Sequence, residues 1–263
     1  SRNAYVVAPN ELGATDVLMV GEKILAVGPN LSVSLPGLSV IDASGFLLVP
    51  GFVDPHVHVL GGGGVGGPIT RAPAITAGKL IRAGITTVVG VLGADVMTRK
   101  LPDLLAKVRE LNALGLSAWM YTSSFRYPPV TLSQSVADDV ALVSEVLGAK
   151  LAMGDANGSF PSTEAVLGLL SQIRQAAVTV KKQGLLHVHL GAIPNPFDIF
   201  EEIAATGFPI GRHLRPTHCA RTEFLLKSAC AYAMQESDRY IDITTDGPCY
   251  LCLLYTSPSP RDR

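Results

Sequence analysis

The chain has 263 residues, of which 48% are apolar and 16% are charged, and its formal net charge is −1. This length allows one large α/β barrel or two ordinary domains around a deep aliphatic core. A pI of about 6.6 excludes the basic surface that binds nucleic acid or an anionic membrane. Although the mean hydropathy is +0.33, Lys79 and Arg82 interrupt the longest apolar stretch, which is too short for a membrane span. We expect a soluble protein.

The four cysteines show no spacing typical of a disulfide framework. Cys249 and Cys252 form a single Cys-x-x-Cys pair, the pattern of a redox centre or of half a zinc site. No second pair accompanies it, so we interpret it as accidental. The chain does not open with a charged segment followed by a hydrophobic one, so nothing predicts secretion. The expected setting is the reducing cytoplasm.

Residues 1–48 predict a series of short strands rich in β-branched and apolar residues. The expected strands are Ala4–Ala8, Asp16–Val20, Lys23–Val27, Leu38–Ile41 and Phe46–Leu48. Gly21 and Glu22 lie between two of them and have the composition of a two-residue hairpin turn.

From residue 49 onward the sequence alternates strand-like and helix-like segments, which is typical of a parallel sheet with helical crossovers. The expected strands are Phe52–His58, Ile85–Val91, Ala118–Thr122, Val146–Lys150, Leu185–Leu190, His213–Thr217 and Tyr240–Thr244. The expected helices are Ala74–Ala83, Leu101–Leu114, Ser133–Ser144, Ser162–Lys182, Pro196–Ala205 and Arg221–Gln235. A closed (β/α)8 barrel has eight strands, so seven predict an incomplete TIM-like barrel.

The last residues of the chain differ in character from the rest. Residues 247–263 offer a short apolar run and a Pro/Ser/Arg end but no further strand and helix. We interpret them as out-of-frame rather than native sequence, with a genuine terminal tail as the alternative. The expected organisation is therefore a small β-domain over 1–48, a barrel over 49–246 and an unassigned tail over 247–263, with the barrel one strand short.

The stretch Val49–Gly64 carries the clearest chemical signal. It is a short apolar run with β-branched residues, entered through Pro-Gly and followed by four glycines. Because side chains alternate along a strand, His56 and His58 point the same way, roughly 7 Å apart. Two imidazoles on one face can reach one metal ion. An isolated His-x-His is as readily a coincidence, but the surrounding Pro-Gly-Phe-Val-Asp-Pro strengthens the metal interpretation.

Polar side chains also lie at the ends of other expected barrel strands. The fourth strand ends at Lys150, the fifth contains His189 and the sixth is followed by His218. In barrels of this kind the working residues lie where strands end and loops begin. Together with His56 and His58, these residues form a candidate metal site of four histidines and one lysine.

The segment Pro-Gly-Phe-Val-Asp-Pro-His-Val-His resembles the first barrel strand of the amidohydrolase superfamily, whose signature is Pro-Gly-hydrophobic-hydrophobic-Asp-x-His-x-His. The glycine run that continues to Pro68, followed by Thr70-Arg71, resembles the isoaspartyl dipeptidase branch, and the similarity extends from Ala4 to Thr245. The resemblance implies that residues 1–48 form part of the small β-sandwich that precedes the barrel in this family.

The resemblance further implies a binuclear metal centre held by His56, His58, Lys150, His189 and His218. A protonated lysine would be repelled by two cations. In the family the corresponding lysine reacts with carbon dioxide, which implies an N6-carboxylated Lys150 that bridges the ions. Imidazole and oxygen ligands favour zinc, although manganese, cobalt or nickel can substitute. Such a pair of ions activates water for attack on an amide.

Two further histidines and one aspartate are less favoured candidates for roles in this centre. His187 faces the same side of its strand as His189, but His189-Leu-Gly matches the family's His-Met-Gly, so His189 is the expected ligand. His213 lies near the start of its strand, away from the chemistry. In the family the proton carrier is an aspartate at the end of the eighth strand. Asp246 is a weak candidate for it, because its context fits strand seven, and the catalytic residue stays unassigned.

Several positions that hold substrate in isoaspartyl dipeptidases differ in this chain. The family's glutamate, threonine, tyrosine and arginine are replaced by Val65, Ala94, Phe125 and Asn157. Lost charge-assisted contacts are worth ~1.5–3 kcal/mol each, enough to weaken dipeptide binding by orders of magnitude. Gly63 and Arg221 are the expected substrate-binding residues that remain, Arg221 as partner of a substrate carboxylate.

The leading hypothesis is a metal-dependent, isoaspartyl-dipeptidase-like hydrolase that cleaves the amide bond of a small molecule or dipeptide. The first alternative keeps the metals and takes a cyclic amide, as dihydroorotases and hydantoinases do. The second is a non-catalytic fragment or homologue. Without the eighth strand we expect this chain by itself to be inactive. The family is commonly oligomeric, so a homo-oligomer is also an open alternative.

Overall fold

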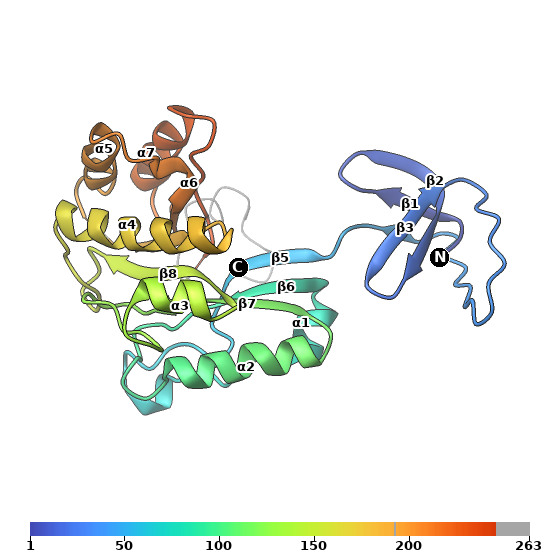
Figure 1. Ribbon diagram of the computed structural model, residues 1–263, viewed down its shortest axis with the longest axis horizontal. Helices are drawn as coiled ribbons and strands as arrows, with labels where there is room; N and C mark the ends of the chain where they lie inside the picture. Colours follow the sequence, from blue (N-terminus) through green and yellow to red (C-terminus); the bar gives the residue numbers. More distant parts are fainter. Residues whose placement is uncertain (192, 246–263) are drawn as a thin grey trace, which may run out of the picture. The chain divides into compact units, whose positions relative to one another are not determined.

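The computed structural model describes residues 1–191 and 193–245. The chain divides into two compact units, Ser1–Phe52 and a second that begins at Val53, and each holds its own sheet (Figure 1). In the described ranges no helix combines the length and apolarity needed to cross a membrane. Asp246, the Cys249–Cys252 pair and the rest of the 247–263 tail lie outside the described residues.

The first unit is a four-stranded sheet in the order β3-β2-β1-β4. Its strands are β1 Ala4–Val7, β2 Glu11–Val20, β3 Lys23–Gly28 and β4 Leu47–Leu48. β2 pairs antiparallel with both β1 and β3, whereas β4 runs parallel to β1. The hairpin turn expected at Gly21 is present, with Gly21 at φ 58°. The expected strand Leu38–Ile41 is not regular. The neighbouring Asp42 forms an isolated bridge with Arg2 and accepts a hydrogen bond from Asn3 (3.2 Å).

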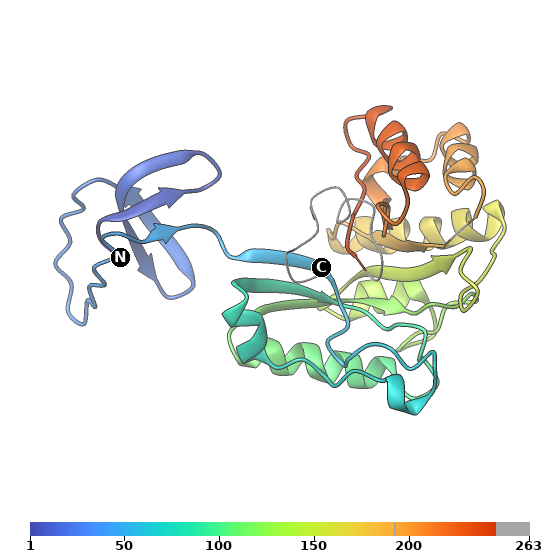
Figure 2. The same ribbon diagram turned by 180° about the vertical axis from the view of Figure 1, so that it is seen from behind.

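The second unit is an incomplete TIM barrel built on six parallel strands in the order β10-β9-β8-β7-β6-β5. The strands are β5 Phe52–Val57, β6 Ile85–Gly90, β7 Ser117–Ser123, β8 Val146–Met153, β9 Leu185–Leu190 and β10 Leu214–Thr217. The helices are α1 Ala77–Arg82, α2 Leu101–Ala113, α3 Val136–Leu142, α4 Thr163–Val180, α5 Asp198–Ala205, α6 Ile210–His213 and α7 Glu223–Met234, with a 3-10 turn η1 at Pro68–Thr70. Figure 2 shows the sheet from behind, with the helices along its outer side.

The seventh expected strand, Tyr240–Thr244, is not a regular strand in the structure. It is an extended segment held beside β10 by two backbone hydrogen bonds, from Asp242 to the Pro216 carbonyl (2.8 Å) and from Cys219 to the Asp242 carbonyl (3.1 Å). A longer ladder cannot form here, because proline has no N–H to donate and His218 turns the chain away at φ 64°. The sheet therefore has six strands among the described residues rather than seven.

The core of the second unit lies between the sheet and its outer helices. Leu104, Val108 and Leu111 of α2 are fully buried, as the helical spacing of leucines predicts. Seven of the eight residues of β8 are buried, which is the burial pattern of a strand covered on both faces. Position 148 within β8 requires glycine, because an added Cβ would collide with the Leu185 carbonyl of β9. This packing fixes the strands whose ends carry the predicted site.

Candidate metal centre

The five residues predicted as metal ligands come from four strands and lie together. The ring of His56 lies 5.3 Å from that of His58 and 4.9 Å from that of His218, centroid to centroid. The His189 ring lies 4.5 Å from His218, and Lys150 Nζ lies 3.3 Å from His56 Nε2. The structure therefore brings all five side chains to one cluster, although their role as ligands stays a prediction.

Burial determines the protonation state of the histidines in the cluster. His56, Lys150, His189 and His218 are buried, and His58 is partly buried. Burial, reinforced by the nearby Lys150, lowers the pKa of His58 to about 3 and moves the pKa of His56 far below its ordinary value. Both rings are therefore neutral at pH 7. Neutral imidazole is the form that binds metal ions.

His56 is oriented by a second histidine, His187. His56 Nδ1 lies 2.8 Å from His187 Nε2, and the Tyr121 ring stacks on His187 at 4.9 Å with an interplanar angle of 8°. A neutral His56 that donates from Nδ1 carries its lone pair on Nε2, which lies 3.3 Å from Lys150 Nζ. His187 thus lies beside the cluster and contacts one of its rings.

A second set of possible metal donors shares His56 with the predicted centre. Donor atoms of His56, His187 and Asp242 all lie within 4.8 Å of one another. The oxygens of Asp242 already accept hydrogen bonds from Thr217 Oγ1 (2.6 Å) and from the backbone N–H of Thr244 (2.8 Å). Sequence reasoning missed Asp242, although its place in the expected seventh strand beside His218 was the signal that could have found it.

His189 has two polar neighbours that compete for the same nitrogen. Its Nε2 lies 3.2 Å from Asp155 Oδ2 and 2.9 Å from the Arg221 guanidinium, which also donates to the Leu190 carbonyl. Nε2 can donate to the carboxylate or accept from the guanidinium, but it cannot do both. Burial alone would raise the pKa of Asp155, but the backbone N–H of Asn157, then His189 and Arg221, lower it. Sequence reasoning missed Asp155, which follows β8 closely.

His218 takes its place through an unusual backbone conformation. It has φ 64°, in the left-handed region that residues other than glycine rarely adopt. Its Nδ1 lies 2.6 Å from the Thr244 carbonyl. A neutral ring that donates from Nδ1 to that carbonyl carries its lone pair on Nε2. His213, in contrast, bonds the Gly184 carbonyl (2.8 Å) at the start of its strand and takes no part in the cluster.

A cavity of about 600 Å³ opens over the loops that follow the strands. Three of the positions that depart from the dipeptidase pattern, Val65, Ala94 and Asn157, line it. The fourth, Phe125, packs edge-on against the His189 ring at 4.4 Å. The two expected substrate-binding residues do not line this cavity. Gly63 pairs with Arg71 in an isolated bridge, and Arg221 borders a separate pocket beside Thr222 and Leu225.

The surroundings of His58 agree with a role of this donor set in binding divalent metal ions. His58 Nδ1 is buried and has no hydrogen-bond partner of normal geometry among the described residues, although the Val91 carbonyl lies near enough to raise the pKa of the ring slightly. This nitrogen lies beside Gly93 and the Val91 carbonyl, which leaves Nε2 as the nitrogen that a metal ion would bind. Neutral imidazoles beside a buried lysine are the chemistry that the predicted centre requires.

Comparisons with known proteins agree with this architecture. A solved β-aspartyl dipeptidase from Fervidobacterium islandicum AW-1 shares 37% identity with a TM-score of 0.88, and the match covers 94% of this chain and 67% of that one. The chain belongs to the amidohydrolase superfamily. A second structure of that dipeptidase, in complex with a β-Asp-Leu dipeptide, is 36% identical at a TM-score of 0.87. No family model matches the chain.

Other relatives of the chain carry the names of enzymes with different substrates. A dihydroorotase from Staphylococcus epidermidis is 28% identical over 188 residues, which are 71% of this chain and 41% of that protein. This chain therefore spans less than half of that curated relative, and about two thirds of the solved dipeptidase. A dihydroorotase structure at 19% identity and a TM-score of 0.53 shows the shared fold alone.

Proposed function

We propose that this chain is the metal-binding part of an amidohydrolase that cleaves an amide bond, with a β-aspartyl dipeptide as substrate. The observation that carries the proposal is the convergence of His56, His58, Lys150, His189 and His218 from four strands. The likeness to the Fervidobacterium dipeptidase over 94% of the chain supports the choice of substrate.

The four imidazoles and Lys150 would hold two divalent ions, and we propose zinc. Lys150 would contribute as a carbamate, formed when its neutral amine adds to carbon dioxide and releases one proton to solvent. The product carries a negative charge and two oxygens, which suit a bridge between cations. When bound, the ions would lower the pKa of water and polarise the amide carbonyl.

The chain's own side chains would orient ligands and substrate around this centre. His187 would accept the Nδ1 hydrogen of His56 and leave Nε2 directed at the ions. Arg221 would turn from His189 to a carboxylate of the substrate, as the paired N–H groups of a guanidinium allow. Phe125 covers one side of His189 and keeps water from it. The carboxylate that passes a proton to the leaving amine stays unassigned, since Asp246 lies outside the described residues.

A cyclic amide is the second candidate substrate. Val65 and Ala94 line the cavity where a zwitterionic dipeptide would need charged or polar partners, and a dihydroorotase is among the relatives. A cyclic amide has no free amino group to bind, so a cavity that lacks the family's glutamate and arginine suits it, although Asp95 and Arg126 also line it. The cytoplasmic setting and a homo-oligomeric state stay predictions from the sequence.

Metal analysis of the purified chain and substrate assays test the proposal together. We expect about two zinc ions per chain by plasma mass spectrometry, and a carbamate signal by carbon NMR after growth in labelled bicarbonate. Lys150→Ala should abolish that signal and release metal. Because we expect this chain by itself to be inactive, the complete gene product, loaded with zinc, is then assayed with β-Asp-Leu, dihydroorotate and hydantoin. Fewer than one metal per chain would contradict the proposed centre, and cleavage of cyclic substrates alone would favour the second candidate.

A further inference from the structure

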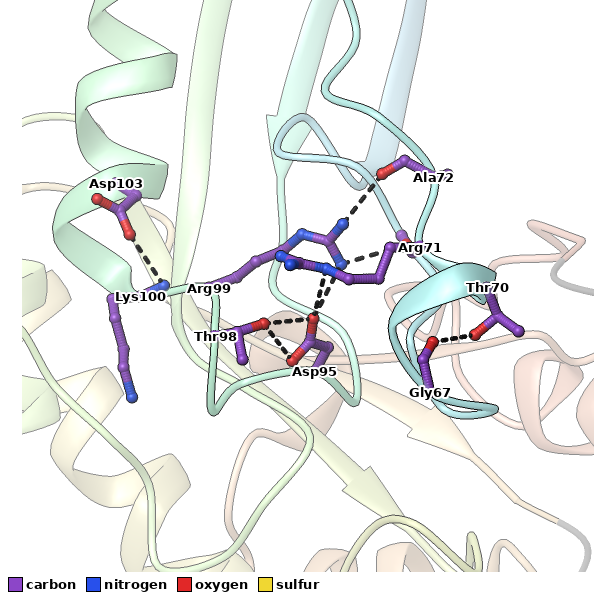
Figure 3. Close-up of polar contacts among 10 residues, drawn as sticks. Gly67, Thr70, Arg71, Ala72, Asp95, Thr98, Arg99, Lys100 and Asp103 are labelled. Atoms are coloured by element: carbon purple, nitrogen blue, oxygen red, sulfur yellow. Dashed lines mark hydrogen bonds and ion pairs between the residues drawn. The ribbon is translucent and has the colours of Figure 1, made fainter.

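Two loops meet beside His58, and a group of charged residues joins them. Residues 58–73 follow β5 and contain the glycine run, and residues 91–100 follow β6. Asp95 of the second loop contacts Arg71 Nε of the first at 3.1 Å and Arg99 at 3.4 Å, and Thr98 Oγ1 donates to it at 2.7 Å. Figure 3 shows these contacts. We call Arg71, Asp95, Thr98 and Arg99 the Asp95 cluster.

Arg99 extends the cluster to the backbone of the glycine loop. Its guanidinium donates to the Gly62 carbonyl (3.2 Å) and to the Ala72 carbonyl (3.0 Å), toward the two ends of that loop. Figure 3 shows the contact with Ala72. The Ala72 N–H donates to Gly62 as well (2.9 Å). Arg99 is only 8% exposed, so these hydrogen bonds are shielded from water. The cluster therefore closes the glycine loop and ties it to the loop after β6.

Both tied loops pass close to the His58 side chain. A Cβ added at Gly93 would lie 2.9 Å from His58 Cε1, and one added at Gly62 would lie 3.6 Å from its Cβ. The backbone of each loop thus forms a wall beside the imidazole. Gly64 lies against Asp95 in the same way, at 3.1 Å for an added Cβ. The position of His58 depends on how closely these two loops are held.

His58 differs from the other histidines of the centre in what orients it. The rings of His56, His189 and His218 each have a polar partner on one nitrogen, namely His187, Asp155 or Arg221, and the Thr244 carbonyl. In the described part of the chain, His58 Nδ1 has no hydrogen bond of normal geometry, and its polar neighbour on that side is the Val91 carbonyl of the loop after β6. Partners of this kind normally set the orientation of a metal-binding histidine. For His58 that task falls to packing.

We infer that Asp95 is a positioning residue for the metal centre: its cluster holds the glycine loop and the loop after β6 against His58 and so fixes this ring in place of a hydrogen bond. The inference rests on the proposed function, because it assumes that His58 binds metal. It assigns a role to Asp95, Arg71 and Arg99 outside the ligand set and outside the substrate positions.

Asp95→Asn tests the role, because it keeps the shape of the side chain and removes its charge. The matched control is Glu145→Gln, the same chemical change at a carboxylate paired with Arg109 at 2.7 Å, away from both loops. Cobalt titration against a chelator should show about tenfold weaker binding for Asp95→Asn and an altered visible spectrum of the bound ion. Arg99→Lys should behave alike, because lysine lacks the fork that reaches two carbonyls. Glu145→Gln should keep wild-type affinity and spectrum.

A metal-free measurement separates this inference from the proposed function. In the apo-protein, Asp95→Asn should speed hydrogen exchange of the Gly64 and Ala72 amides at least tenfold and shift the NMR signal of His58 Cε1. Wild-type affinity and spectrum in Asp95→Asn, or faster exchange without a change at His58, would overturn the inference. Failure of the wild-type chain to bind metal would contradict the proposed function. The exchange rates and the His58 signal would still show whether Asp95 positions the two loops and the ring.

Discussion

The His56 ring is held by His187, a neutral acceptor, rather than by a carboxylate. The 2.8 Å contact between their nitrogens and the stacked Tyr121 leave His187 little freedom. Burial, followed by the charge of Lys150, lowers the pKa of His187 well below its ordinary value, so it is neutral and able to accept. This places the His56 lone pair on the side of Lys150.

Replacing His187 should therefore weaken metal binding without removing a ligand. We expect His187→Leu to lose 10–100-fold in zinc affinity, the usual effect of losing a partner of a metal-binding histidine. His187→Gln, which retains an acceptor, should lose less. Chelator competition measures both. His213→Gln is the control, since His213 bonds the Gly184 carbonyl away from the cluster. Equal affinity of His187→Leu and wild type would contradict this role.

The ion pair between Glu145 and Arg109 predicts a pH-dependent share of stability. The hydrogen bond from Arg109 lowers the pKa of Glu145 to about 2, below the value near 4.5 expected when unfolded. Because the folded pKa is the lower one, the pair stabilises above pH 4.5 and this share is lost as the pH falls toward 2. We expect Glu145→Gln to lower the free energy of unfolding in urea by about 0.5–1 kcal/mol at pH 6. Near pH 2 the difference between variant and wild type should approach zero. A cost independent of pH would argue against the ion pair.

At the scale of the elements, the regular strands and helices follow from local patterns, and the exceptions have local causes. The apolar run of β8 and the leucine spacing of α2 predict both elements within a few residues of their bounds. The segment 240–244 could not be predicted correctly, because its pairing depends on Pro216 and on the left-handed His218 of another strand. Residues 38–41 are apolar like a strand but find no regular partner.

The residues at the strand ends are the part of the candidate site that could be predicted from the sequence. The alternation of side chains and the position of the strand ends predicted that these residues would meet. The choice of His189 over His187, which faces the same side, came from the family resemblance. Asp155 and the Asp95 cluster were missed, because their contacts join loops that no local pattern relates. Asp242 was missed although its place in the expected seventh strand could have indicated it. A carboxylate in a loop is usually solvated, and only the folded chain shows that Asp95 faces two arginines.

The helix α4 contains a glycine whose replacement should stabilise the protein. Gly168 lies within α4, and an added Cβ would meet no atom within 4 Å. Gly168→Ala should raise the free energy of unfolding by about 0.5–1 kcal/mol, because alanine loses less backbone entropy in a helix. Urea denaturation checks this. Gly148→Ala is the contrast and should destabilise, since its Cβ collides with β9. A destabilised Gly168→Ala would contradict the packing described for α4.

At the scale of the whole molecule, the two units differ greatly in their cores. The barrel unit has one large core cluster, whereas the buried core of the N-terminal unit consists of Ala4, Val6 and Val17. Large apolar side chains of the N-terminal unit stay exposed, including Ile24 at 66% and Phe46 at 69%. A unit of about fifty residues with so small a core is marginally stable by itself.

The N-terminal unit should therefore unfold before the barrel unit. We expect limited proteolysis during a temperature ramp to cut first within residues 21–46, while the barrel unit stays intact. Mass spectrometry of the fragments identifies the cuts. First cuts within α4 or β8, or simultaneous loss of both units, would show that the small core does not limit stability.

Anomalous diffraction from crystals of the zinc-loaded chain tests the central claim most directly. The account predicts two zinc peaks about 3.5–4 Å apart among His56, His58, Lys150, His189 and His218, with extra density on Lys150 for the carbamate. A single peak held by His56, His187 and Asp242, the other donor set of this fold, would contradict it.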